Sequence, residues 1–231
     1  MTLDDIFKQL AVGELQHTGD VENGVVKPSS YQRLANHVEL ALLDLFTRFP
    51  LKERELILDQ DDNTTFYHLH SRHALSTGDN GEQKYINDTN NPFTDDIIAI
   101  QSIWNEDGTL VPLNDSTCST SIFSPAPTTL QILEPVTGNS NFIIYRAAHP
   151  KFGTVTDPTT VSVDVPANAM TAILAYVANR AYSSNQSNEA QVIATQYMAK
   201  YEMACTFLQK HISVNNVSDL VKPAFEINQW P

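Results

Sequence analysis

The sequence predicts an α+β protein, in which helices from both ends of the chain form one bundle around an inserted antiparallel β-rich subdomain. Two observations predict it. Apolar residues recur at helical spacing near both ends, whereas the middle contains short β-rich runs separated by turn residues. We therefore divide the chain into an N-terminal helical part (1–50), a β-rich insert (51–165), a C-terminal helical hairpin (166–211) and an extended C-terminal tail (212–231).

The N-terminal part is expected to contain two helices. Thr2 is a candidate N-cap for the first helix, because two acidic residues follow it where the helix dipole favours negative charge. The second helix begins near Ser30 and ends at Pro50. Its apolar stripe includes Leu42 and Leu45, which we expect to be buried in the bundle.

The middle of the chain reads as several short strands. Residues 55–70 suggest a strand, a turn and a second strand, and residues 95–113 repeat this shape around an Asp107-Gly108 hairpin turn. Three more β-rich runs follow, with the sequences TTLQILEP, NFIIYRAAH and TVSVDVP, whereas residues 76–93 read as a polar loop. This spacing is typical of a small sandwich or barrel-like sheet.

Residues 166–211 predict an αα-hairpin. Pro166 suits an early helix position, and Ile173 and Val177 lie on one apolar face of the first helix, where we expect them to be buried. Alanines recur every third residue and allow another backbone to approach closely. The polar run SSNQSN breaks the pattern before a second helix about 30 Å long.

Charge and composition exclude several classes of function. The net charge of −13 disfavours direct binding to nucleic acid or to anionic membranes, because an acidic surface repels phosphates. No apolar run approaches the roughly 20 residues that span a bilayer, and the acidic start does not read as a secretory signal. The two distant cysteines, Cys118 and Cys205, are expected to be free thiols.

The sequence contains no catalytic signature. Nucleotide-binding glycine motifs and the nucleophile-elbow motif are both absent from the sequence. His68, His70 and His73 are weak metal candidates, since the first two would share one face of a strand. No further ligand follows at a recognised spacing, and a solvated strand edge explains them better. We expect no catalytic residue, no bound metal and no cofactor.

The layout resembles the head-to-tail adaptor (connector) proteins of short-tailed bacteriophages. The resemblance lies in the N-terminal helices (LDDIFKQLAVGEL and YQRLANHVELALLDLFTRFP), the β-rich insert, and a closing helical segment rich in Ala and Tyr (AILAYVANRAYSSNQSNEAQVIATQYMAKYEMA). It covers nearly the whole chain and concerns layout rather than a fixed motif. The His-rich strand and the 76–93 loop have no counterpart in the family.

This resemblance implies a structural protein of the virion neck or tail, assembled in the host cytoplasm. The chain would form a homo-oligomeric ring, typically a dodecamer, beneath the portal protein and above tail nozzle or tail tube proteins. DNA would pass through the lumen without specific binding, and no membrane would be involved. Small-residue helical faces suit lateral packing, and a heterologous contact closes into a ring when its rotation divides the circle.

The C-terminal tail would dock on the portal or on a neighbouring subunit. Its interface candidates are Pro223, Phe225, Ile227 and Trp230, because an extended apolar peptide can add to a sheet edge while alternate side chains fill pockets. The alternative is that the tail folds back on its own bundle.

Two other functions stay open from the sequence. One is a carbohydrate- or fibre-binding module of a phage tail built on the β-rich insert, for which Phe93 and Trp104 are the candidate exposed aromatic residues. The other is a metal-dependent hydrolase that uses the three histidines.

Overall fold

A computed structural model of the chain describes residues 1–185 and 187–220, and for residues 211–220 it describes the backbone alone. The chain divides into two compact units. We call residues 1–49 together with 151–220 the helical unit, and residues 50–150 the β unit. This mixture of helices with a central β-rich part agrees with the predicted α+β class.

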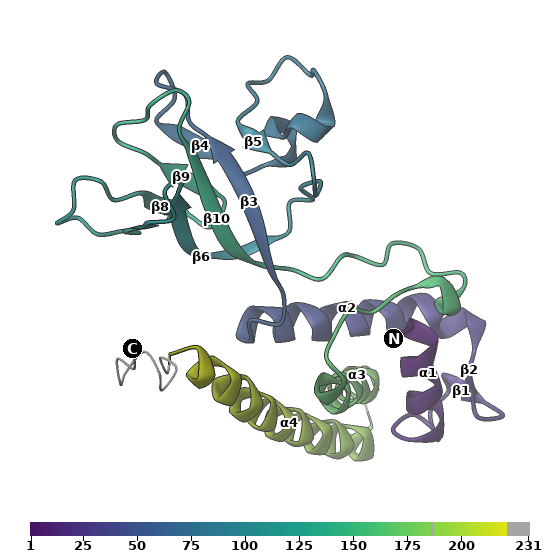
Figure 1. Cartoon of the computed structure of the whole chain (residues 1–231). Helices are drawn as coiled ribbons and strands as arrows, with labels where there is room; N and C mark the ends of the chain where they lie inside the picture. Colours follow the sequence, from purple (N-terminus) through teal and green to yellow (C-terminus); the bar gives the residue numbers. More distant parts are fainter. Residues whose placement is uncertain (186, 221–231) are drawn as a thin grey trace, which may run out of the picture. The chain divides into compact units, whose positions relative to one another are not determined.

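The helical unit contains four helices (Figure 1). Its elements are α1 (Leu3–Val12), a hairpin of β1 (Val21–Glu22) and β2 (Val25–Val26), α2 (Tyr31–Arg48), α3 (Met170–Ser183) and α4 (Asn188–Leu220). Thr2 caps α1 as predicted, because its hydroxyl accepts a hydrogen bond from the Asp5 backbone while the Asp5 carboxylate accepts one from the Thr2 backbone.

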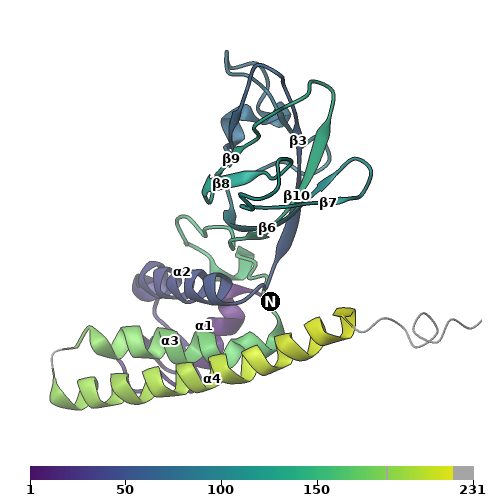
Figure 2. The ribbon, with the colours of Figure 1, turned by 90° about the vertical axis from the view of Figure 1, so that its left-hand side faces the viewer.

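The core of the helical unit lies between the apolar stripes of its helices. Leu42 and Leu45 on α2, and Ile173 and Val177 on α3, are all buried there. Alanines on α3 are buried as well, which lets α4 approach closely; Figure 2 shows the two helices side by side. Burying a large apolar side chain contributes about 2 kcal/mol, so these stripes stabilise the unit.

The β unit consists of two antiparallel sheets with one core. Its strands are β3 (Glu53–Asp59), β4 (Phe66–His68), β5 (Ile86–Asn87), β6 (Ile97–Asn105), β7 (Leu110–Val111), β8 (Phe123–Ala126), β9 (Thr129–Gln131) and β10 (Ser140–Ala147). The larger sheet has the order β5-β3-β10-β6-β7, and the smaller has the order β4-β9-β8. Leu58 and Ile143 of the larger sheet share a buried cluster with Tyr67 and Leu130 of the smaller one.

The local signals in the insert had different outcomes. The hairpin around Gly108 is confirmed as β6–β7, and Gly108 takes the positive φ of 72° that the turn needs. The strand, turn and strand expected over 55–70 are confirmed as β3, a turn and β4, but these two strands do not pair with each other, because β4 pairs with the distant β9 in the other sheet. Tyr67 on β4 is buried in the shared core, and this burial outweighs the short connection.

The predicted insert ended at residue 165, but the β unit ends at Pro150. The expected strand at 160–166 is also wrong, since only Ser162 forms an isolated bridge, to Thr2. The reason is that these residues satisfy their backbone groups with the N-terminus: Leu3 N donates to Val161 O (2.9 Å), and Val163 N donates to Met1 O (2.8 Å).

The predicted tail began at residue 212, yet α4 continues to Leu220. No glycine or proline interrupts the chain between the start of α4 and Pro223, so nothing in the sequence breaks its helical hydrogen bonds earlier. The interface candidates Pro223, Phe225, Ile227 and Trp230 lie outside the described residues. No described helix is both long and apolar enough to cross a membrane.

The 76–93 loop is fixed by a buried carboxylate. Asp88 accepts hydrogen bonds from the backbone and hydroxyl of Ser76 (2.8 and 2.5 Å) and from the Phe93 backbone (2.8 Å). Burial acts to raise the pKa of Asp88, but these hydrogen bonds outweigh it and lower the pKa. The loop is therefore an ordered part of the β unit.

Candidate functional site: an apolar stripe on the last helix

The inner face of α4 packs on α3. Its buried residues are Ala190, Ala194, Tyr201, Cys205 and Leu208, which recur at helical spacing. Asn179 on α3 donates a hydrogen bond to the Ala194 carbonyl (2.8 Å). Tyr176 on α3 meets the Tyr201 ring edge-on, with centroids 5.1 Å apart. This face of α4 is thus occupied by its own chain.

A polar cluster fixes how α4 is rotated against α2. The hydroxyl of Tyr201 donates a hydrogen bond to the Asp44 carboxylate on α2. Arg48 bridges Asp44 (2.8 Å) and Glu202 on α4 (2.9 Å), and its guanidinium lies over the Tyr201 ring. Burial and the bond to Asp44 raise the pKa of Tyr201, so the hydroxyl keeps its proton and stays a donor.

The opposite face of α4 carries a second apolar row. Val192, Met203 and Phe207 are 59%, 60% and 58% exposed, and Ala199 lies exposed between them. Steps of seven, four and four residues bring these positions to one side of a helix, and at 100° per residue that side faces away from Tyr201. We call these four residues the α4 stripe. A contiguous exposed apolar row indicates a contact surface, whereas scattered apolar residues need no explanation.

A second exposed apolar patch lies on α2. Leu40 and Leu43 are three residues apart and therefore neighbours on the helix surface, and Leu43 is 56% exposed. We call this pair the α2 patch. The helical unit thus carries two different apolar surfaces, which is what a head-to-tail contact between identical chains requires.

Tyrosines of α3 and α4 pack against other rings of the helical unit. Tyr182 on α3 stacks on Tyr197 of α4 with ring centroids 5.8 Å apart, and Tyr201 is fully buried. We did not expect the α4 stripe from the sequence, although the positions of Val192, Met203 and Phe207 already carry the spacing of one helix face.

The structure does not bring the three histidines together as one site. His73 is buried, stacks on Tyr85 and has its Nδ1 2.9 Å from the Gln83 carbonyl. His70 accepts a hydrogen bond from the Arg72 backbone, and His68 faces Thr129 across the small sheet. Within the described residues, no group of three or more His, Cys, Asp or Glu side chains is placed to hold a metal.

The two candidate exposed aromatic residues lie in different environments. Phe93 is buried in the β-unit core, where its ring meets Tyr145 edge-on, so the expectation that it is exposed is wrong. Its backbone N–H donates a hydrogen bond to the buried Asp88 carboxylate (2.8 Å). Trp104 is half-buried on the large sheet, and its indole N–H donates to Ser102 (3.0 Å).

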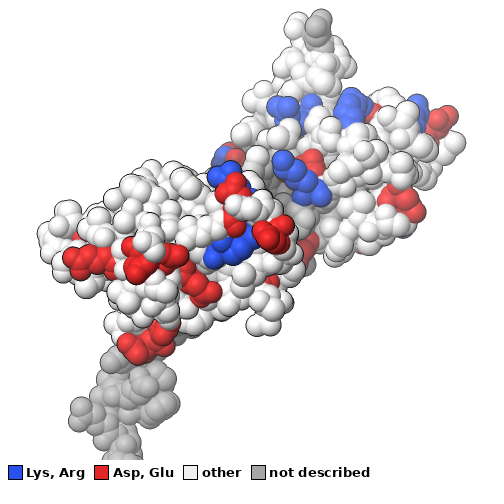
Figure 3. All heavy atoms as spheres, turned by 90° about the horizontal axis from the view of Figure 1, so that it is seen from above, with Lys and Arg blue, Asp and Glu red and all other residues white. Residues whose placement is uncertain are grey.

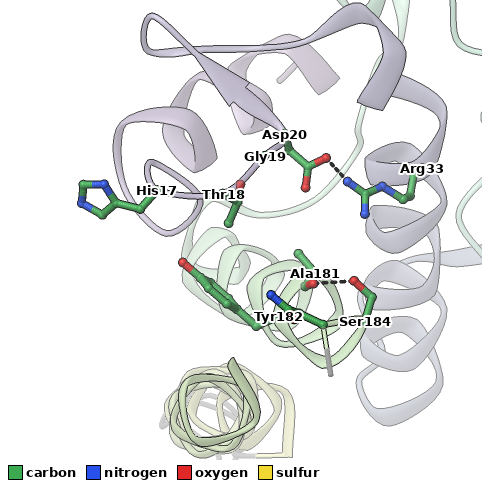
Figure 4. A pocket seen from close by; sticks show the side chains of 9 residues that line it. His17, Thr18, Gly19, Asp20, Arg33, Ala181, Tyr182 and Ser184 are labelled. Carbon is green, nitrogen blue, oxygen red and sulfur yellow. Dashed lines mark hydrogen bonds and ion pairs between the residues drawn. The ribbon is translucent and has the colours of Figure 1, made fainter. Parts of the chain in front are cut away.

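A polar pocket of about 420 Å³ opens in the helical unit between the α1–α2 connection and the end of α3 (Figure 4). Its one buried carboxylate, Asp20, is already bound by Arg33 and by the Ser30 hydroxyl (2.7 Å). The Ser30 side chain therefore binds Asp20 and makes no capping hydrogen bond to α2. Because the charges in this pocket neutralise each other, it offers little to a charged ligand.

The charges of the chain are unevenly divided. The β unit has fourteen Asp and Glu against five Lys and Arg, a net charge of −9, which leaves −4 for the remaining residues. On the face seen in Figure 3, Lys and Arg form separate small groups among wide uncharged areas. Comparison with models of protein families and with curated protein sequences finds no match.

Proposed function

We propose that this protein is a head-to-tail adaptor of a short-tailed bacteriophage, and that it forms a ring between the portal protein and tail nozzle or tail tube proteins. One observation carries the proposal: α4 is apolar on two opposite sides, and its own bundle covers only one of them. The other side, the α4 stripe, is available to a neighbouring copy.

The contact we propose joins the α4 stripe of one subunit to the α2 patch of the next. Because the two surfaces differ, the contact is heterologous, and repeating it closes a ring when the rotation divides a full turn. A dodecamer is the copy number that the resemblance implies. Met203 and Phe207 would be central to the contact, since large, flexible or aromatic side chains dominate interface energies.

The acidic chain suits a channel that DNA must traverse. A surface with a net charge of −13 repels phosphates, so a lumen lined by it would favour passage over adhesion. We assign no catalytic role, no cofactor and no membrane association to the protein, and its location would be the neck or tail of the virion.

The mass of the native protein tests the ring. Wild-type protein, alone or mixed with a portal, is expected to form a discrete oligomer in native mass spectrometry. The double substitution Met203→Glu and Phe207→Glu should leave monomers with an unchanged thermal midpoint, because both side chains are exposed in the monomer.

The matched control is Gln209→Glu. Gln209 is exposed on the same helix but lies about 120° around the axis from the α4 stripe, so the added charge should leave the oligomer intact. A wild-type protein that stays monomeric with and without a portal would contradict the proposal. An oligomer that stays unchanged in the Met203→Glu and Phe207→Glu double variant would also contradict it.

A further inference from the structure

The large sheet of the β unit carries an apolar row on the face turned away from its core. Ile57, Phe142, Trp104 and Leu110 lie directly opposite one another on the consecutive strands β3, β10, β6 and β7. Side chains alternate along a strand, and the neighbours Leu56, Leu58, Ile103 and Ile143 belong to the buried core. The row therefore points to the other face, where its members are half-buried or exposed.

A groove of about 320 Å³ follows this row. Its lining includes Trp104 and Phe142 from the row, Ile144 two residues along β10 on the same face, and the residues Glu55, Asn105, Glu106 and Gly108. Glu55 is exposed, and Glu106 accepts a hydrogen bond from the Ser140 backbone and is exposed as well. Both charged groups in this described lining are acidic, and neither is paired with Lys or Arg in a described ion pair.

We propose that this groove binds an extended, basic segment of a partner protein. Apolar side chains of the segment would fill the groove over Trp104 and Phe142, and its Lys or Arg side chains would pair with Glu55 and Glu106 in the same lining. The charge of −9 on the β unit would draw such a segment toward it. This inference is independent of the ring, because it concerns a surface of the β unit alone.

The lining favours a protein segment over a carbohydrate. Sugars bind by stacking on aromatic rings and by many hydrogen bonds, but here Ile144 in the lining, with Ile57 and Leu110 in the adjoining row, supplies aliphatic surface beside the two rings. The indole N–H of Trp104 already donates to Ser102, so it is engaged within the sheet. An apolar row flanked by carboxylates matches a segment that carries both apolar and basic side chains instead.

Trp104 provides the measurement. The chain has two tryptophans, so the background substitution Trp230→Phe leaves Trp104 as the single indole fluorophore. The probes are two decapeptides, one of alternating Lys and Val and one of alternating Glu and Val. We expect the Lys-Val peptide to change Trp104 emission saturably and the Glu-Val peptide to leave it unchanged.

Two double variants then distinguish binding in the groove from general attraction to the negative charge of the β unit. Glu55→Gln with Glu106→Gln should weaken binding of the Lys-Val peptide about tenfold, because both ion pairs are lost. Glu82→Gln with Glu134→Gln removes the same charge from exposed positions outside the groove lining and should change affinity little. The folded state of each variant is checked by its thermal midpoint.

Several results would overturn the inference. Equal weakening by the two double variants would show attraction to the whole unit and not to the groove. A Trp104 signal with an oligosaccharide library but not with the Lys-Val peptide would assign the groove to sugars. No signal with any probe, together with protection of Trp104 from acrylamide quenching, would show that the chain's own helices cover this face.

Discussion

The buried hydroxyl of Tyr201 on α4 donates a hydrogen bond to the carboxylate of Asp44 on α2, which Arg48 also binds. Tyr201→Phe removes the donor and leaves the rest of the ring in place. We expect the helical unit to lose about 1 to 3 kcal/mol of unfolding free energy, since a buried hydrogen bond to a charged group is lost. The loss of unfolding free energy is measured by urea unfolding, monitored by circular dichroism.

Tyr197→Phe is the matched control for that prediction. The Tyr197 ring stacks on Tyr182, but its hydroxyl has no hydrogen-bond partner among the residues the structure describes. Its removal should shift the urea midpoint little. Equal losses for the two substitutions would show that the contact between Tyr201 and Asp44 contributes nothing specific.

The apolar core of the bundle gives a second prediction. Leu42→Ala, Leu45→Ala, Ile173→Ala and Val177→Ala should each cost about 2 to 5 kcal/mol, with the valine at the lower end, because each opens a cavity in a buried site. Leu43→Ala, one residue along α2 from Leu42 but 56% exposed, should leave the thermal midpoint of the monomer nearly unchanged. If all four core variants kept the thermal midpoint of the wild type, the assignment of these residues to the buried faces of α2 and α3 would be wrong.

The acidic charge predicts the behaviour toward DNA. We expect no appreciable binding of duplex DNA at physiological salt, because the net charge is −13 and the sequence contains no run of basic residues. Fluorescence anisotropy of a labelled duplex is the measurement. Micromolar binding with a steep salt dependence would contradict both this prediction and a channel that DNA passes through freely.

The C-terminal segment gives a fourth prediction, although it lies outside the described residues. Deleting residues 222–231, which include Phe225, Ile227 and Trp230, should leave monomer stability nearly intact and abolish assembly onto a portal. Co-sedimentation with a portal measures the second effect. A large loss of monomer stability would show that the tail folds back on its own bundle.

Tyr85 makes the β unit sensitive to alkali. Burial raises its pKa to about 12, because the anion would be poorly solvated beside His73 and Tyr67. Between pH 10 and 12 the unfolded chain releases this proton while the folded chain keeps it, so stability falls as pH rises. The contribution is fully present below about pH 10.

Tyr85→Phe should flatten this alkaline loss in urea unfolding by about 2 kcal/mol, because a phenyl ring cannot ionise. Its stability at neutral pH should be lower, since the Tyr85 hydroxyl exchanges two hydrogen bonds with the His68 backbone (2.9 Å each). An alkaline slope equal to that of the wild type would assign the effect to other buried tyrosines.

Local signals in the sequence were reliable where they needed no distant partner. The cap at Thr2 and the turn at Gly108 depend on residues within three positions, and both are confirmed. The partner of β4 could not be read locally, because Leu130 and Tyr67 meet across more than 60 residues of sequence. The same holds for the bridge between Thr2 and Ser162, which joins the segment after the β unit to the N-terminus.

The candidate surfaces could not be predicted from the sequence, for a different reason. On α4, helical spacing is shared by the exposed residues Val192, Met203 and Phe207 and by the residues of the inner face. When a helix is apolar on two sides, its sequence does not show which side the bundle covers. The row through Trp104 and Phe142 can be identified only from the register of the strands. The position of Phe93 depends on the fold of the 76–93 loop, where its backbone donates to Asp88.

The strands that begin and end the β unit are immediate neighbours. Glu53 at the start of β3 lies opposite Arg146 near the end of β10, and Ala147 N donates to Lys52 O (3.0 Å). Because its two ends are paired, the β unit affects the helical unit as a short loop would, although it contains about a hundred residues. The entropic cost of holding α2 and α3 together therefore does not grow with the size of the insert. We therefore expect that the β unit can be excised, or grafted onto another helical bundle, without a change in how the helices are connected.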